Sequence, residues 1–269
     1  MAMEETNGNS AAPADDRATI RTVRRALAVL RAFRSTDREL PLGEIASRAR
    51  LDKGTTHRLL RTLIVERLVE QQEAGMTYSL GIGVLELAAG LTREGDLRQR
   101  AQPVLAGLAE STGTTAFLGI VHDGQALCIG RVDGGLAIQI RSWSIGGRLP
   151  LHGGAGPRVL MANMPAGDRE RLLAGSLEAL TSRTPTDPVA LRDRLATIRE
   201  RGWDIGVNEI IEGVSSVAVP VRGRDGAVIA TISISGLTPH MMEEGRPRHL
   251  PELQARVRKL EAGLTGEAS

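Results

Sequence analysis

Hydrophobic side chains in the first part of the chain recur with a helical period, which changes to that of strands near residue 68. Between residues 22 and 33 apolar positions lie three, four and seven residues apart, which predicts an amphipathic helix. A short helix over 42–47 and a third helix capped by Asp52 follow. Residues 68–72 and 76–80 then predict the two strands of a hairpin. Three helices followed by a β-hairpin predict a winged helix-turn-helix domain.

The pattern beyond residue 80 predicts a connecting helix and then a mixed α/β region. Apolar positions from Ile82 to Leu91 share one helical stripe, and residues 92–96 are the best domain boundary. Further helices are expected over 97–111 (with a kink or restart at Pro103), 159–162, 168–174, 191–201 and 251–264, and strands over 114–122, 126–132, 137–143, 214–221 and 228–235. Helices packed on an antiparallel meander favour a small-molecule sensor fold over a parallel doubly wound sheet.

The charge is uneven along the 269 residues, although the net charge is only +2. Residues 20–67 hold 12 basic against 5 acidic side chains, whereas residues 92–269 hold 21 against 20. A local basic excess of this kind suits a polyanionic partner. Residues 1–19 carry four acids and one base without hydrophobic periodicity, so they are expected to form a disordered leader.

Composition narrows the possible classes of protein further. The sequence contains no apolar run long enough for a membrane span and no secretory signal in its first 17 residues, so a soluble cytoplasmic protein is expected. Cys128 is the single cysteine, and the five histidines form no i, i+4 pair. We therefore expect neither a structural metal nor a cofactor. Aromatic residues make up only 2% of the chain, which disfavours an RNA-binding module that stacks bases on exposed rings.

The third helix has an outward face with the chemistry of DNA recognition. Its apolar side is formed by Thr56, Leu59, Leu60 and Leu63. In helix-turn-helix proteins the first residues of the recognition helix reach base edges, and neighbouring side chains contact phosphates. A solvated basic face on an ordinary helical bundle is the alternative. The candidate DNA-binding residues are Lys53, Gly54, Thr55, Thr56, His57, Arg58 and Arg61.

Blocks from both halves of the chain resemble one family, the IclR-type transcriptional regulators. The N-terminal blocks are Thr22–Leu30, Ile45-Ala46, Leu51–Leu63 and Tyr78–Gly81. The C-terminal blocks, in the same order as in the family, are Pro150–His152, Ala155-Gly156, Arg201–Trp203, Glu209, Glu212–Val214, Val217–Pro220 and Ile232–Gly236. The recurrence of two unrelated blocks together makes the resemblance specific.

This resemblance implies an α+β protein that binds double-stranded operator DNA and responds to a small-molecule effector. The expected parts are a winged helix-turn-helix over 20–80, a linker helix over 81–95 and a GAF-like effector-binding domain over 96–265. Members assemble as homodimers or tetramers and include both repressors and activators. Two-fold symmetry would let paired recognition helices read half-sites about one helical turn, or a multiple of it, apart.

The resemblance also implies an effector site. The candidate residues are Ala155, Gly156, Ser216, Ser233 and Ser235. Independently, Ser233 and Ser235 are two apart on an expected strand, so both hydroxyls project to one face. The alternative is a pair of surface serines.

The site departs from the family pattern at three places. Members that bind 2-oxo acids tend to carry aspartate at the position of Gly206 and cysteine at that of Ser216. The usual Gly-Lys is Pro157-Arg158, and we expect Arg158 to face solvent or an interface. These differences favour a larger, less charged effector than a 2-oxo acid.

The alternative hypothesis is an enzyme or nucleotide-binding protein that uses the glycine-rich loop Gly153–Gly156. A dinucleotide fingerprint needs a parallel strand before the loop and a third Gly or Ala where Val159 stands, so the fingerprint is broken. The sequence has no Gly-x-Ser-x-Gly elbow, and Cys128 lies in an apolar strand where an inert thiol is expected. No catalytic residue is proposed.

Overall fold

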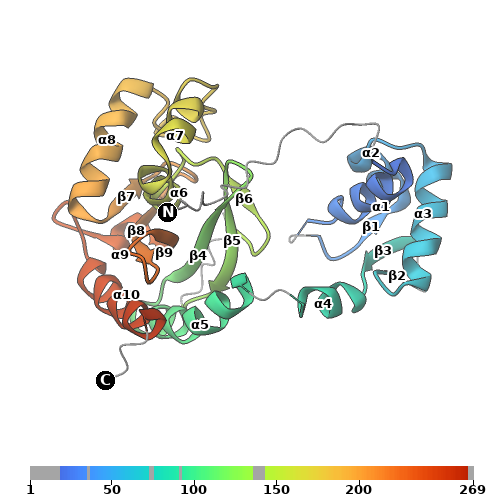
Figure 1. Cartoon of the computed structure of the whole chain (residues 1–269), viewed down its shortest axis with the longest axis horizontal. Helices are drawn as coiled ribbons and strands as arrows, with labels where there is room; N and C mark the ends of the chain where they lie inside the picture. Colours follow the sequence, from blue (N-terminus) through green and yellow to red (C-terminus); the bar gives the residue numbers. More distant parts are fainter. Residues whose placement is uncertain (1–18, 35–36, 73–75, 91–92, 136–142, 266–269) are drawn as a thin grey trace, which may run out of the picture. The chain divides into compact units, whose positions relative to one another are not determined.

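The computed structural model describes residues 19–34, 37–72, 76–90, 93–135 and 143–265, and no side-chain placement is described for 93–96. The chain divides into two compact units, residues 1–90 and 91–269 (Figure 1). The expected leader over 1–19 lies almost wholly outside the described residues, as does most of the expected strand over 137–143. None of the described helices combines the length and apolar character that a membrane span requires.

The first unit is a helical trio with a small antiparallel sheet. Its elements are α1 (Arg21–Arg31), β1 (Leu40–Pro41), α2 (Leu42–Ala49), α3 (Lys53–Val65), β2 (Val69–Gln71), β3 (Thr77–Leu80) and α4 (Gly83–Ala88). The strand order is β1-β3-β2. Val29 of α1, Ile45 of α2 and Leu60 of α3 meet in one buried cluster with Val69 and Tyr78 of the hairpin. The three helices and the hairpin agree with the sequence pattern, whereas the two-residue edge strand β1 was not expected.

The loop before α3 shows why this helix begins at Lys53. The Asp52 carboxylate accepts a hydrogen bond from the Thr55 backbone N–H at 2.7 Å, as an N-cap does. That hydrogen bond holds the pKa of Asp52 below its usual value. Arg50, at φ 55°, ends α2 in the left-handed conformation and turns the chain toward α3.

The second unit is built on a six-stranded antiparallel sheet. Its elements are α5 (Arg93–Thr112), β4 (Thr115–His122), β5 (Gln125–Val132), β6 (Arg148–Leu149), α6 (Ala155–Asn163), α7 (Ala166–Leu173), α8 (Pro188–Arg201), β7 (Asp204–Val207), β8 (Val214–Arg222), β9 (Val228–Leu237), α9 (Thr238–Met241), β10 (Met242–Glu243), β11 (Arg246–Pro247) and α10 (Leu250–Thr265). The strand order is β6-β5-β4-β9-β8-β7, with a separate β10-β11 pair. Pro103 stands inside α5 without ending it, so the helix does not restart there.

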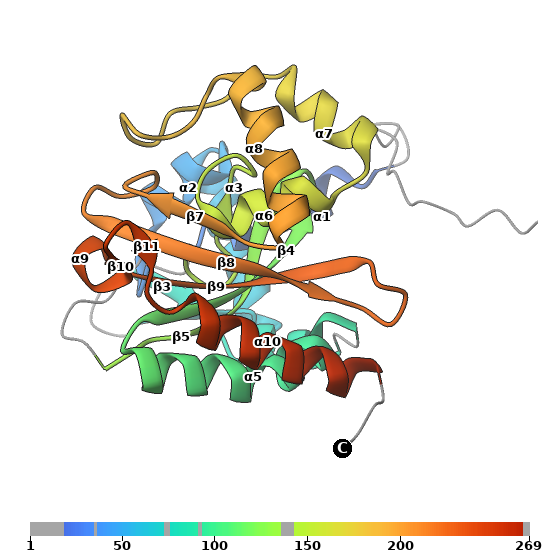
Figure 2. The same ribbon diagram turned by 90° about the vertical axis from the view of Figure 1, so that its left-hand side faces the viewer.

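Helices cover both faces of this sheet. Figure 2 shows α5 and α10 on one face and α6, α7 and α8 on the other. Side chains of β9 alternate between the two layers. Ile232 and Ile234 belong to the buried cluster that contains Leu105 of α5 and Val257 of α10. Ser233, between them, therefore faces the layer of α6.

Candidate DNA-reading helix and effector cavity

The outward face of α3 carries most of the predicted DNA-binding residues. Lys53, Gly54, His57, Arg58 and Arg61 are exposed and Thr55 is half-buried. Thr56 differs, because it is fully buried and its hydroxyl donates to the Asp52 carbonyl oxygen at 2.9 Å. The structure thus brings six of the seven residues to one accessible surface and places the seventh in the core.

A cavity in the second unit lies between the sheet and the start of α6. It encloses about 260 Å³ of empty space, counting its open mouth. All five residues predicted for effector binding lie on its wall. The lining residues are Phe117, Trp143, Leu149, Ala155, Gly156, Pro157, Ile210, Ser216, Ser233 and Ser235.

Three serine hydroxyls form the polar part of the cavity wall. Ser216 of β8 pairs with Ser235 of β9 across the sheet, and Ser233 is the next β9 residue on that face. The Ser216 Oγ accepts a hydrogen bond from the Ala155 backbone N–H at 3.3 Å. Ser233 and Ser235 are 3% and 7% exposed, and among the described residues their hydroxyls have no hydrogen-bond partner. Both residues line the cavity, so a ligand or water can supply the hydrogen-bond partner that their hydroxyls lack.

Two aromatic rings form the apolar part of the wall. The ring centroids of Phe117 and Trp143 lie 6.0 Å apart with the planes tilted by 31°. Phe117 stands opposite Ser233 in the β4–β9 register, and the Trp143 indole N–H donates to the Gly147 carbonyl at 3.1 Å. Gly119 makes room for the indole, because a Cβ there would lie 2.2 Å from the Trp143 ring.

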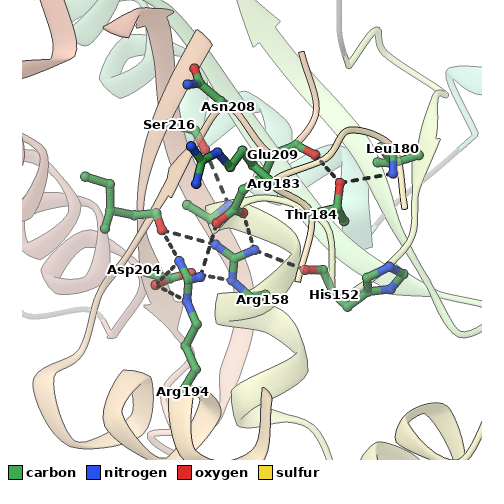
Figure 3. A network of polar contacts seen from close by, with 12 residues as sticks. His152, Arg158, Leu180, Arg183, Thr184, Arg194, Asp204, Asn208, Glu209 and Ser216 are labelled. Atoms are coloured by element: carbon green, nitrogen blue, oxygen red, sulfur yellow. Dashed lines mark hydrogen bonds and ion pairs between the residues drawn. The ribbon is translucent and has the colours of Figure 1, made fainter. Parts of the chain in front are cut away.

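Arg158 of α6 is fully buried and joins α6 to β7, which corrects the expectation that it faces solvent or an interface. Its Nε lies 2.7 Å from the Asp204 carboxylate, and its Nη1 donates to the Glu209 carboxylate. The same guanidinium donates to the carbonyls of His152 at 3.0 Å and Ile205 at 3.1 Å. Figure 3 shows it between the two carboxylates. Pairing with two anions is what permits a guanidinium in the core.

Arg194 of α8 reaches the same two carboxylates from the solvent side. It lies 3.1 Å from Glu209 and 3.4 Å from Asp204, and its side chain is 31% exposed (Figure 3). Arg201, at 2.9 Å from Asp204, completes the group. The network therefore connects α6, α8 and β7 behind the cavity.

Gly206 of β7 lies next to Ser216, where a side chain would have little room. The two residues are paired in the β7–β8 register. A Cβ at Gly206 would lie 3.1 Å from the Ser216 Oγ, 3.1 Å from the Ala155 nitrogen and 3.0 Å from Oε2 of Glu209. An aspartate here would crowd all three groups, so this chain differs from the 2-oxo-acid pattern in geometry as well as in charge.

Family comparisons cover almost the whole chain. Residues 22–73 match the "IclR helix-turn-helix domain" model, and residues 89–262 match "Bacterial transcriptional regulator IclR C-terminal". The chain belongs to the IclR family. It is an IclR-type transcriptional regulator with a helix-turn-helix DNA-binding domain and an effector-binding domain.

Relatives of this IclR-type regulator are similar over most of their length. The chain is 34% identical over 250 residues to the glycerol operon regulatory protein of Streptomyces griseus, covering 91% of this chain and 95% of that protein. It is 35% identical over 220 residues to the HTH-type transcriptional regulator XynR of Escherichia coli, covering 81% and 87%.

Solved structures agree with the fold of this regulator. An IclR transcriptional regulator from Alicyclobacillus acidocaldarius matches with a TM-score of 0.79 at 30% identity, covering 91% of this chain and 98% of that one. An IclR homologue from Microbacterium hydrocarbonoxydans, complexed with 4-hydroxybenzoate, matches with a TM-score of 0.78 at 25% identity and the same coverage. The homologues that carry a functional name are transcriptional regulators, not enzymes.

The loop Gly153–Gly156 of this IclR-type regulator lacks the setting of a dinucleotide fingerprint. The strand before it, β6, pairs antiparallel with β5, and Val159 is buried where the fingerprint needs a small residue. Cys128 is buried, and burial raises the pKa of its thiol to about 12. A thiol in this state is a poor nucleophile. The dinucleotide alternative is therefore not favoured.

Sequence reasoning missed the apolar half of the cavity and the ion pairs behind it. The chain has only five aromatic residues, and Phe117 and Trp143 are two of them. This rarity alone did not indicate that they line a cavity. The sequence around Arg158 gave a stronger indication, because Arg158 is a single charge inside the apolar run from Pro157 to Ala162. A charge in such a run predicts burial with a partner.

Proposed function

We propose that this regulator reads operator DNA with the outward face of α3 and senses a small molecule in the cavity between α6 and β9. The residues assigned to DNA are Lys53, Gly54, Thr55, His57, Arg58 and Arg61, and those assigned to the effector are Ala155, Gly156, Ser216, Ser233 and Ser235. The division into a winged helix-turn-helix over 20–80, a linker helix over 81–95 and an effector domain over 96–265 is part of the same proposal. The protein acts in the cytoplasm, where its operator lies.

The DNA assignment is supported by basic side chains that are exposed and form no close ion pair in the described part of the chain. Within the described part of the chain, neither Arg58 nor Arg61 is in an ion pair, and both are exposed. Guanidinium groups of this kind bind guanine edges bidentately or contact phosphates. The Asp52 cap fixes the start of the helix and thus the position of these groups.

The effector assignment depends on one observation above all. Ser233 and Ser235 are more than nine-tenths buried, yet their hydroxyls face a cavity and lack protein partners among the described residues. The ligand-bound Microbacterium homologue supports a bound small molecule as the partner that these hydroxyls lack.

Pairing of two copies is supported by apolar side chains that the first unit leaves in solvent. Val23 and Leu27 of α1 are 52% and 43% exposed, and Leu85 and Leu87 of α4 are 65% and 69% exposed. We assign these faces to a second copy of the chain, because an operator with two half-sites requires two recognition helices. Exposed apolar area of this extent is a common mark of an interface.

Footprinting on DNA upstream of the protein's own gene, with and without a metabolite panel, tests this assignment. A protected region with dyad symmetry that changes with one metabolite is expected. The variant Ser233→Ala/Ser235→Ala should keep its operator affinity without effector and respond only at much higher effector concentration. Loss of DNA binding without effector would reassign the serines to folding, and an unaltered response would exclude them from the site. Turnover of the metabolite would contradict a purely regulatory role.

A further inference from the structure

We propose that the cavity selects a compact, uncharged, hydroxyl-bearing ring compound and discriminates against carboxylates. This inference rests on the proposed effector role of the cavity and adds the chemical class of ligand.

Among the residues that the structure describes, none of those lining the cavity has an ionisable side chain. Its ten lining residues are apolar, glycine or serine. A carboxylate that enters such a site loses its hydration without gaining a counter-ion, which is unfavourable. An uncharged ligand does not carry this cost.

The nearest buried cation is already neutralised. The Arg158 guanidinium donates to the carboxylates of Asp204 and Glu209 and to two carbonyl groups. Moreover, a Cβ added at Gly206 would lie 3.1 Å from the Ser216 Oγ and 3.0 Å from Oε2 of Glu209, so these two groups are close together. The ionic group closest to Ser216 is therefore the Glu209 carboxylate, which is paired with Arg158 and Arg194 and offers no positive charge to an anion.

The start of α6, which faces the cavity, has little capacity for anions. Helix N-termini bind anions through the free N–H groups of their first turn. Here the Ala155 N–H is taken by the Ser216 hydroxyl, and Pro157 has no N–H. Gly156 is left with the one N–H that a ligand can use. This N–H and the serine hydroxyls are uncharged donors, so a buried carboxylate would still lack a counter-ion here.

The same wall suits a small ring with a hydroxyl group. The Ser233 and Ser235 hydroxyls each offer a donor and an acceptor, which matches the two roles of a ligand hydroxyl. Phe117 and Trp143 present ring surfaces beside them. The empty space of about 260 Å³ includes the open mouth, so the enclosed part is smaller and suits a compact ligand.

A matched pair of small-molecule probes tests the proposed chemical class of the ligand. The compounds 4-methylphenol and 4-hydroxybenzoate share the ring and the hydroxyl, and they differ by a methyl group in place of a carboxylate. Titration of the full-length protein, followed by calorimetry and by tryptophan fluorescence, should give saturable binding of 4-methylphenol. We expect it to bind at least about tenfold more tightly than 4-hydroxybenzoate. Equal or tighter binding of 4-hydroxybenzoate, or no saturable binding of 4-methylphenol, would overturn the proposal.

Three variants separate the ligand class from the location of the site. Ser233→Ala/Ser235→Ala should weaken 4-methylphenol binding by about tenfold, and the matched change Ser182→Ala at an exposed position should not. Ile210→Lys places an ammonium group at the half-buried edge of the cavity and should shift the preference toward 4-hydroxybenzoate. If 4-hydroxybenzoate binds more tightly and the serine variant weakens it, the site is right and the class is wrong. If the serine variant affects neither probe, the proposed effector site itself fails.

Discussion

The guanidinium of Arg158 and the carboxylate of Asp204 form an ion pair with no part in solvent, at 2.7 Å between Nε and Oδ2. Both groups have lost their hydration, and the geometry of the pair is what compensates that loss. The two residues come from α6 and β7, so the pair fixes the helix that begins at the cavity against the strand that holds Gly206. Breaking such a pair costs much more than removing both partners together.

Arg158→Met is expected to destabilise the second unit by about 3–5 kcal/mol, because Asp204 and Glu209 are left buried without their central cation. Urea unfolding of the full chain, followed by tryptophan fluorescence, measures this effect. Both tryptophans, Trp143 and Trp203, lie in residues 91–269, so the signal reports on that unit.

The control for this experiment is Arg192→Met, which removes an exposed arginine paired with Glu170 at 2.8 Å. Exposed pairs contribute little because water screens them. A similar loss of stability in both variants would show that burial of Arg158 is not what makes it important.

Gly119→Ala should push Trp143 into the cavity, because the added Cβ would lie 2.2 Å from the indole ring. We expect a destabilisation of about 1–3 kcal/mol from overpacking, a shift of the tryptophan emission and loss of the effector response. Gly167→Ala is the matched control, since a Cβ there meets nothing within 4 Å. An unchanged emission together with an unchanged effector response would refute the proposed role of Trp143 as a cavity wall.

Arg58→Ala should weaken binding to a footprinted operator by about 1–3 kcal/mol if its guanidinium contacts a base. Gel-shift titrations at fixed salt, on operator and on random DNA, measure the difference. Equal losses on the two DNAs would reassign Arg58 to a phosphate, and no loss on either would remove it from the interface. Arg199→Ala, an exposed arginine of α8, serves as the control and should leave both affinities unchanged.

The stability of the second unit should depend on pH through His249. Its Nε2 is buried without a hydrogen-bond partner among the described residues, and its ring lies 5.2 Å from that of His240. Burial, and then the nearby His240, lower the pKa of His249 below its usual 6.5, with Arg248 and Glu252 as smaller influences of opposite sign. The unfolded chain therefore takes up this proton at a higher pH than the native one. Stability should fall as the pH drops below about 6.5 and level off below the native pKa.

Urea unfolding at several pH values between about 7 and 5 checks the role of His249. His249→Gln cannot titrate, so wild type should lose stability relative to this variant as the pH falls. His122→Gln, at an exposed position of β4, should keep the wild-type pH profile. A parallel loss in wild type and His249→Gln would assign the acid sensitivity to other groups.

Local patterns predicted the elements whose signal lies within a few residues of sequence. The helical period and the Asp52 cap identified α3, and the i, i+2 spacing of Ser233 and Ser235 placed both hydroxyls on one face. These features need no knowledge of the tertiary partners, because the backbone alone sets the direction of the side chains.

The ion-pair partners of Arg158 could not be predicted in the same way. Its partners Asp204 and Glu209 lie 46 and 51 residues further along the chain, and nothing local indicates that they converge. With no partner identified, we expected Arg158 at the surface, although the apolar residues around it indicated burial. Strand β7 was missed for a related reason, since four residues that include Gly206 carry too little alternation to predict a strand.

Strand β9 contributes side chains both to the cavity and to the hydrophobic core on the opposite face of the sheet. Its serines border the cavity, and its isoleucines pack with Leu105 and Leu108 of α5, the first helix after the DNA-binding unit. A ligand that displaces β9 would therefore also displace side chains that never touch it. Genetic selection for alleles that ignore the effector should therefore return substitutions at Ile232 and Ile234 as readily as at the serines. Such alleles would be misjudged as simple folding defects unless their operator binding were assayed.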